Sequence, residues 1–213
     1  MKLRTGMGIL LLSCSFAGSA ALAQQGEQGG RPPGQQGPPT LTSTLQFQLS
    51  IVERETVSIA EAMPEDKYSF APTNGNFAGV RTFAQEVKHV ATANDRFFDS
   101  ILGNTPPAAP DEGVGSNGPD TIATKAQIVQ YLKDSYAMGH KAIATITADN
   151  AVTPLQNPAV PFLNTRMAQA MFACTHAMDH YGQMVEYLRD VGGTPPMSAN
   201  RPPANPPAAA PKQ

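Results

Sequence analysis

The chain has 213 residues and a formal net charge of −2, with 15 Lys and Arg residues against 17 Asp and Glu residues. This mildly acidic balance lacks the basic surface that nucleic-acid-binding proteins present, so nucleic acid is not an expected partner. After the N-terminal segment, no apolar run is long enough to cross a bilayer. We therefore expect no transmembrane segment in the mature protein.

The first 23 residues have the organisation of a secretory signal peptide. MKLR is a basic start, GMGILLLSCSFAG is a short apolar stretch, and Ala21-Leu22-Ala23 matches an A-x-A cleavage site. We expect cleavage after Ala23 and a periplasmic or secreted protein. Cys14 loosely resembles a lipoprotein processing site, but the Ala-Leu-Ala site is the better match. Cleavage would leave Cys174 as the single cysteine, which excludes an intramolecular disulfide.

Proline divides the chain into expected ordered and disordered parts. Segments 24–40 and 194–213 are rich in Pro together with Gly, Gln, Ala or Asn. Such compositions cannot bury enough apolar surface to offset the entropy of ordering, so both are predicted to be disordered. A proline inside a helix costs about 3 kcal/mol or more, so each proline-free run between them is predicted to form one helix. These runs are 41–63, 77–105, 120–149 and 162–194.

Local signals support helices in these runs. Thr82 followed by Gln85, and Ser43 followed by Gln46, have the spacing of a capping box. Asp120 is the expected N-cap of the third helix. Apolar residues recur at three- and four-residue steps, and no run alternates with period two.

Four long helices predict an all-α fold with one core, most simply a four-helix bundle spanning 41–193. Gly192-Gly193 is a common helix terminator and is expected to end the last helix. The connections are long enough for antiparallel or parallel neighbours, so loop length does not decide the topology.

The histidines are the candidate site residues. His176 and His180 lie four residues apart on one helix face, so both can bind one metal ion. The pair alone is a weak signal, because such spacing also occurs on solvated faces. A third ligand could come from His89 or His140, and sequence position does not choose between them. Glu86-x-x-His89 is a single copy of a motif that di-iron bundles need twice.

Two segments of the sequence resemble the DinB/YfiT-like family. MPEDKYSFAPTNGNFAGVRTFAQEVKHVATAN, at 63–94, follows the family pattern of a P-x-D-x-Y-x-F-x-P loop, an R-T/S pair and H-V-A-x-x-N. HAMDHYGQMVEYLRDVGGTPP, at 176–196, is similar to the family's H-x-x-x-H-x-G-Q-x-x-x-Y-L-R-x-x-G-x-x-P-P. The resemblance covers 41–196. In the first segment it rests on Pro64, Asp66, Tyr68, Phe70, Pro72, Arg81, Thr82, His89, Val90, Ala91 and Asn94.

The resemblance implies a bundle with up-up-down-down topology and a divalent metal ion, zinc or nickel, held by three histidines. Its motifs place the ligands at His89, His176 and His180. His140 has no counterpart among them, and is expected to be a packed residue or to lie behind the ligands. Asp179 stands where the family often has a further histidine. It either orients an imidazole or is a solvated helix charge.

Other residues of the last predicted helix have alternative interpretations. Met167, Met171 and Met178 lie on one side and suit either a copper-binding stripe or ordinary core packing. Cys174 is expected to be a small buried residue turned away from the histidines, not a fourth ligand. Gly182 is expected to let another helix approach closely.

The expected function is that of a metal-dependent enzyme. An ion held by three histidines has open positions, where it can activate water or a thiol, or polarise a carbonyl. Characterised members of the resembled family include thiol transferases and an isomerase. That analogy suggests a transferase or hydrolase acting on an unknown small molecule. The alternative is a non-catalytic bundle that binds metal structurally or acts through its surface. The sequence identifies no general base, and it leaves open whether the protein forms a homodimer.

Overall fold

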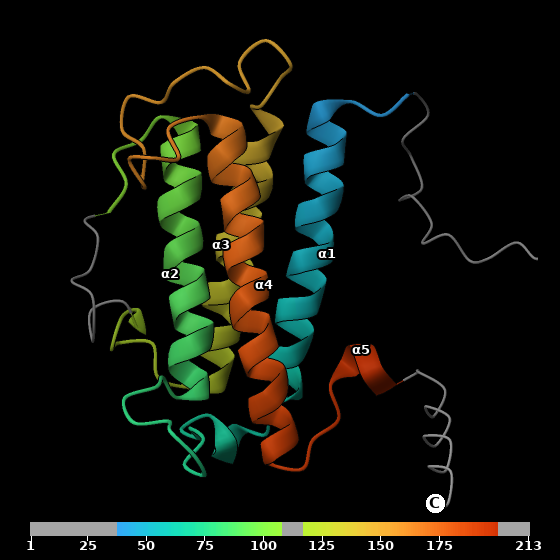
Figure 1. Cartoon of the computed structure of the whole chain (residues 1–213), viewed down its shortest axis with the longest axis vertical. Coiled ribbons are helices and arrows are strands. Elements are labelled where there is room, and N and C mark those ends of the chain that lie inside the picture. Colours follow the sequence, from blue (N-terminus) through green and yellow to red (C-terminus); the bar gives the residue numbers. More distant parts are fainter. Residues whose placement is uncertain (1–37, 108–116, 200–213) are drawn as a thin grey trace, which may run out of the picture. The chain divides into compact units, whose positions relative to one another are not determined.

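The computed structural model describes residues 38–107 and 117–199, and the regular secondary structure of this part of the chain consists of helices and one isolated bridge between Pro154 and Thr165. The predicted signal peptide, most of the predicted linker and the tail from residue 200 lie outside the described residues. The predicted four-helix bundle is confirmed (Figure 1). The helices are α1 (Leu41–Ala62), the single-turn η1 (Glu65–Lys67), α2 (Phe83–Leu102), α3 (Lys125–Ala144), α4 (Arg166–Asp190) and the short α5 (Pro196–Ala199).

Capping boxes headed by threonine begin α1, α2 and α3. The predicted pair in α2 is confirmed, because Gln85 N–H donates to Thr82 Oγ1 at 3.3 Å and Thr82 N–H donates to Gln85 Oε1 at 2.8 Å. The box predicted from Ser43 and Gln46 is wrong, since Ser43 closes a box headed by Thr40. The Gln46 side chain instead donates to a carbonyl of α3 at 2.7 Å, so a tertiary contact determines its role.

The start of α3 also differs from the prediction. Asp120 is not its N-cap, because the helix begins after Thr124, which forms a capping box with Gln127. This box satisfies the first amides of α3 locally, as Thr82 and Gln85 do in α2. At the other end of the bundle sequence, α4 stops at Asp190, before Gly192 in the left-handed conformation (φ +84°), as the glycine pair predicted.

Hydrogen bonds between elements establish that α1 and α3 are antiparallel. Thr42 Oγ1, at the start of α1, donates to the Ile146 carbonyl just after α3. Lys125 Nζ, at the start of α3, donates to the Met63 carbonyl just after α1 at 2.7 Å. Each helix therefore begins where the other ends.

By the same reasoning α2 and α3 are parallel, since Thr92 pairs with Tyr131 at 3.1 Å and Asn94 donates to Ser135 at 3.2 Å. Figure 1 shows α4 running against both. In chain order the directions are up, down, down, up, which corrects the expected up-up-down-down order. Contacts place the helices around the bundle in the order α1, α3, α2, α4, so the parallel pairs are neighbours. The long connection between α2 and α3 allows the chain to return to the end where α2 began.

Gly139 of α3 lies close to two neighbouring helices in the core. A Cβ there would lie 2.5 Å from the Phe98 ring of α2 and 3.0 Å from Leu49 of α1, so a larger residue would require these side chains to shift. The close approach predicted at Gly182 is wrong. That residue is exposed on α4, and nothing lies within 4 Å of a Cβ built there.

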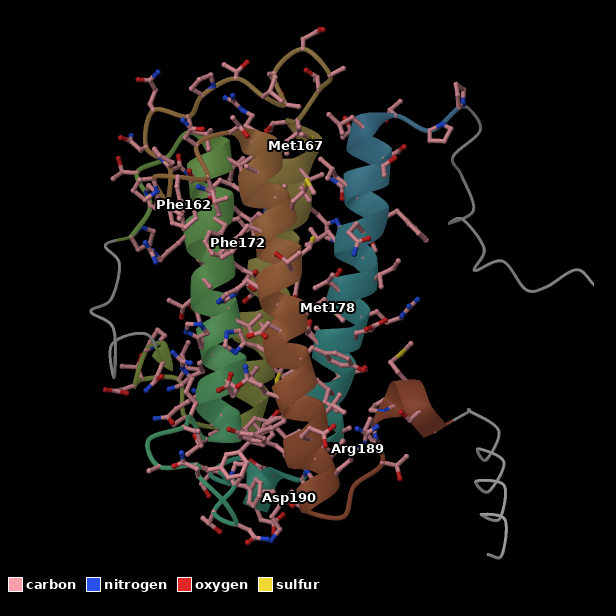
Figure 2. The ribbon with its side chains drawn as sticks, in the orientation of Figure 1. Phe162, Met167, Phe172, Met178, Arg189 and Asp190 are labelled. Atoms are coloured by element: carbon pink, nitrogen blue, oxygen red, sulfur yellow. The ribbon has the colours of Figure 1, made fainter. Side chains whose placement is uncertain are left out.

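The sulfur-containing residues of α4 lie in different surroundings. Met167 and Met178 pack against the core at separate levels of the helix (Figure 2), whereas Met171 is 54% exposed. Ordinary packing therefore accounts for two of the three methionines. Cys174 is buried as predicted, and burial raises the pKa of its thiol to about 11.

The predicted disordered tail from 194 begins with a described segment. Pro196–Ala199 form the single turn of α5, which contacts α1. Among the helices in the described part of the chain, none combines the length and apolar character that crossing a membrane requires.

Candidate metal centre

Three of the four histidines meet between α2 and α4. His89 lies in the second turn of α2, and His176 and His180 lie on successive turns of α4. The nitrogens through which they could bind an ion lie within 4.8 Å of one another. His89 Nε2 and His176 Nε2 are 3.2 Å apart, and the His180 ring centroid is 4.6 Å from each of the other two. The structure thus brings together the three residues predicted as ligands.

Glu86 positions one of these imidazoles. It lies on α2 one turn before His89, and its carboxylate accepts a hydrogen bond from His180 Nδ1 at 2.6 Å. Both side chains are buried, with 8% of His180 and 2% of Glu86 exposed. With Nδ1 held by the carboxylate, His180 has its Nε2 left for an ion. This role of Glu86 was not predicted from the sequence. The available signal was the three-residue spacing that puts Glu86 on the same helix face as His89.

Aromatic rings pack against His176 on the side away from Glu86. Its ring centroid lies 5.7 Å from that of Phe97 on α2 and 5.9 Å from that of Phe172, which Figure 2 shows where α4 faces α2. Burial, followed by the nearby charges of the other two histidines and of Arg81, lowers the pKa of His176 to about 3. The imidazole is therefore neutral at physiological pH, which is the form that binds metal ions.

A divalent metal ion fits this donor set. Two nitrogens bound to a tetrahedral zinc ion at about 2.0–2.1 Å lie roughly 3.3 Å apart, close to the 3.2 Å between the Nε2 atoms of His89 and His176. His176 Nδ1 is buried without a hydrogen-bond partner among the described residues. The cluster could hold a metal ion and leave positions open for water or another ligand.

A polar cavity of about 470 Å³ lies at the end of the bundle where α2 begins and α4 ends. We call it the Arg81 cavity. Arg81 is held in place there, since its Nε donates to Asn117 Oδ1 at 2.9 Å and its carbonyl accepts from Tyr187 Oη at 3.1 Å. The other polar side chains of the lining are those of Gln85, Glu86, Asn117 and Gln183. In the sequence, Arg81 is recognisable only as a residue of the family motif, and that motif predicts no role for it.

Two further predicted candidates lie outside the cluster. His140 packs between α3 and α1, with Nδ1 2.5 Å from Gln46 Oε1 and Nε2 2.9 Å from Glu53 Oε2. Asp179 is exposed on α4 and accepts a hydrogen bond from Gln183 at 3.3 Å. It is a solvated helix charge, and the orienting role considered for it belongs to Glu86.

Comparison with known proteins agrees with this architecture. The sequence-family model of the DinB superfamily matches residues 48–184. A solved structure of a DinB-like protein from Bacillus cereus ATCC 10987 has a TM-score of 0.56 and 17% identity, over 74% of this chain and 96% of that one. A conserved protein of Enterococcus faecalis has a TM-score of 0.55 and 16% identity, over 71% of this chain and 97% of that one. These two likenesses concern the fold, and no curated protein sequence matches the chain. Because the family model spans more than half of the sequence, this protein belongs to the DinB superfamily.

Proposed function

We propose that this protein holds one divalent metal ion through His89, His176 and His180 and uses it in a transferase or hydrolase reaction on a small molecule. The observation that carries the proposal is the convergence of these imidazoles, whose nitrogens lie within 4.8 Å of one another. Membership of the DinB superfamily supports it, because the motifs that carry the resemblance contain the same residues.

A bound ion would supply Lewis acidity, which lowers the pKa of a coordinated water or thiol and polarises a carbonyl. The chain's own residues organise the surroundings. Glu86 holds His180 in one orientation through its Nδ1. Phe97 and Phe172 pack against one side of His176. The Arg81 cavity offers room for a substrate at the end of the bundle.

Zinc or nickel is the metal we propose. Imidazole nitrogens suit zinc, copper, iron and nickel, whereas magnesium and calcium prefer oxygen ligands. The resemblance described above favours zinc and nickel within that group. Copper has no further support, because Met171 is exposed and the other two methionines of α4 pack in the core.

Elemental analysis of the mature protein, purified without an affinity His-tag, tests the metal site. Wild type and the variants His89→Ala, His176→Ala and His140→Ala would be compared. We expect about one zinc or nickel ion per chain in wild type and in the His140 control, and loss of the ion from the other two. A wild-type protein that contains no metal and takes up neither added zinc nor added nickel would contradict the proposal.

Catalysis is tested separately on the metal-loaded protein, with thiols paired with activated esters as first substrates. Metal-dependent turnover that disappears in His89→Ala would support the enzyme. Tight metal binding without turnover of these substrates would favour the alternative of a non-catalytic metal-binding or protein-interaction bundle.

We also propose that the protein acts in the periplasm or outside the cell after cleavage behind Ala23. The proposal rests on the basic start, the apolar stretch and the A-x-A site of the first 23 residues. Intact mass and N-terminal sequencing of the protein recovered from each cell fraction test it. An N-terminus at Gln24 in the exported fraction is expected, and an uncleaved cytoplasmic protein would refute export.

A further inference from the structure

The Arg81 cavity lies about one helical turn from the metal cluster along the bundle axis. Gln85 and Glu86 come one helical turn before His89, and Gln183 comes one turn after His180. One turn corresponds to about 5–6 Å along the axis. The rings of Phe97 and Phe172 lie on the opposite side of His176. The cavity next to the cluster along the axis therefore lies on the Arg81 side, and none of the three histidines is among its lining residues.

We propose that the Arg81 cavity is a subsite for the carboxylate group of the small molecule whose other end binds at the metal. This inference rests on the proposed metal site and names the substrate class that the site would take. The cavity volume of about 470 Å³ lies within the range of roughly 300–1,000 Å³ that small-molecule sites occupy.

The hydrogen bonds of the cavity side chains leave mainly donors facing a ligand. Gln85 Oε1 accepts the Thr82 N–H at 2.8 Å, so its NH₂ group is the one that it can offer. Asn117 Oδ1 accepts the Arg81 Nε–H at 2.9 Å, which likewise leaves an NH₂ group. Because each of these partners is an N–H, the amide oxygen has to face it. Gln183 and Glu86 are the exceptions, since Gln183 Nε2 donates to Asp179 at 3.3 Å and the Glu86 carboxylate can only accept. A donor-rich cavity suits a ligand group that only accepts, as a carboxylate does.

The charge of the site favours an anion. Three neutral imidazoles leave the double positive charge of a bound ion uncompensated. Glu86 offsets part of that charge, but its carboxylate is occupied by His180 and is only 2% exposed. Arg81 adds a positive charge on the cavity wall. A hydrogen bond between a guanidinium and a carboxylate is charge-assisted and therefore stronger than one between neutral groups.

Cobalt-loaded protein titrated with 3-mercaptopropionate and with 3-mercaptopropionamide tests the subsite. The two probes carry the same thiol and differ in whether the far end is a carboxylate or a neutral amide. The near-ultraviolet absorption of a thiolate bound to cobalt reports binding of either one. We expect the acid to bind wild-type protein about tenfold more tightly than the amide, the effect of one charge-assisted hydrogen-bonded pair.

Variants assign that preference to the cavity. Arg81→Gln should remove it while the protein still binds cobalt. Gln183→Glu, at an exposed position, should weaken binding of the acid by placing a negative charge beside it. Arg54→Gln is the matched control, because it removes a positive charge whose side chain is 62% exposed on α1. Melting temperatures close to that of the wild type would show that the variants are folded.

Equal affinity of wild type for acid and amide, or a preference that survives Arg81→Gln, would overturn the subsite and leave the metal site standing. Failure of the wild type to bind cobalt would instead contradict the proposed function. In that case calorimetry with succinate and metal-free protein decides the subsite. Succinate binding that is lost in Arg81→Gln supports it, and absence of binding to wild type overturns it.

Discussion

His140 and the cluster of three histidines lie in one bundle but differ in the atoms that their ring nitrogens face. Each ring nitrogen of His140 meets an oxygen from α1, Gln46 Oε1 at 2.5 Å and Glu53 Oε2 at 2.9 Å. In the cluster, His89 Nε2 and His176 Nε2 face each other at 3.2 Å. A histidine with an acceptor at each nitrogen has its hydrogen-bonding capacity used within the protein. Nitrogens that face one another offer lone pairs to a cation. The difference separates a structural histidine from candidate ligands more sharply than sequence position can.

The largest expected difference is in stabilisation by metal. With free zinc at 100 to 1,000 times its dissociation constant, wild type and His140→Ala should gain about 3–4 kcal/mol of unfolding free energy. His89→Ala should gain little, because removing one of three ligands weakens binding. Thermal unfolding with and without zinc measures this effect. A similar gain in His89→Ala would erase the proposed distinction between the two histidine groups.

The comparison can be sharpened at the carboxylates that pair with the two kinds of histidine. Glu86→Gln should weaken metal affinity about 10- to 100-fold, because outer partners orient and polarise metal-binding imidazoles. Glu53→Gln, the same change beside His140, should leave metal affinity as it is. Competition with a chromophoric chelator gives both constants. Equal losses in the two variants would show that Glu86 has no special relation to the site.

His140→Ala should destabilise the fold by about 1–2 kcal/mol with metal content unchanged, because Gln46 and Glu53 lose hydrogen-bond partners that join α1 to α3. Urea unfolding measures the loss. Adding Glu53→Gln to the His140→Ala variant should cost less than it does in wild type, since the partner is already gone. Full additivity would mean that the observed contact has no energetic role.

The smallest expected effect is the pH dependence of stability, in which the contribution of Asp95 has to be distinguished from that of the histidines. Burial, opposed by a hydrogen bond from Tyr131, raises the pKa of Asp95 to about 6. The folded state then binds the extra proton, so stability is lost as pH rises from about 4 through 6. Asp95→Asn should remove that loss and be about 1 kcal/mol more stable than wild type at pH 7, after allowance for partial exposure. Urea unfolding of the metal-free protein at pH 4 and pH 7 checks this. If Asp95→Asn left the difference in unfolding free energy between pH 4 and pH 7 unchanged, that difference would arise from other groups.

Local sequence signals predicted the four helices well, because proline positions and apolar periodicity act within each segment. The run 41–63 became α1 at Leu41–Ala62, and the Thr82 and Gln85 cap formed as expected. Where local alternatives existed, the prediction failed. Thr40 is the N-cap in place of Ser43, and the Gln46 side chain hydrogen-bonds to α3. Loop length could not decide the order of helix directions, because both connections allowed either one.

The sequence by itself determined the helices and, through the four-residue spacing and the family motifs, the three candidate ligands. Those features depend on residues that are close along the chain or belong to one recognisable pattern. Only the tertiary structure showed that Glu86 hydrogen-bonds to His180 and that both ring nitrogens of His140 pair with side chains of α1. It also showed that Arg81 lines a cavity near the cluster. Each of these contacts joins different segments. They depend on the relative direction, rotation and height of neighbouring helices. Core packing decides these quantities, and the spacing of residues within one helix does not predict them.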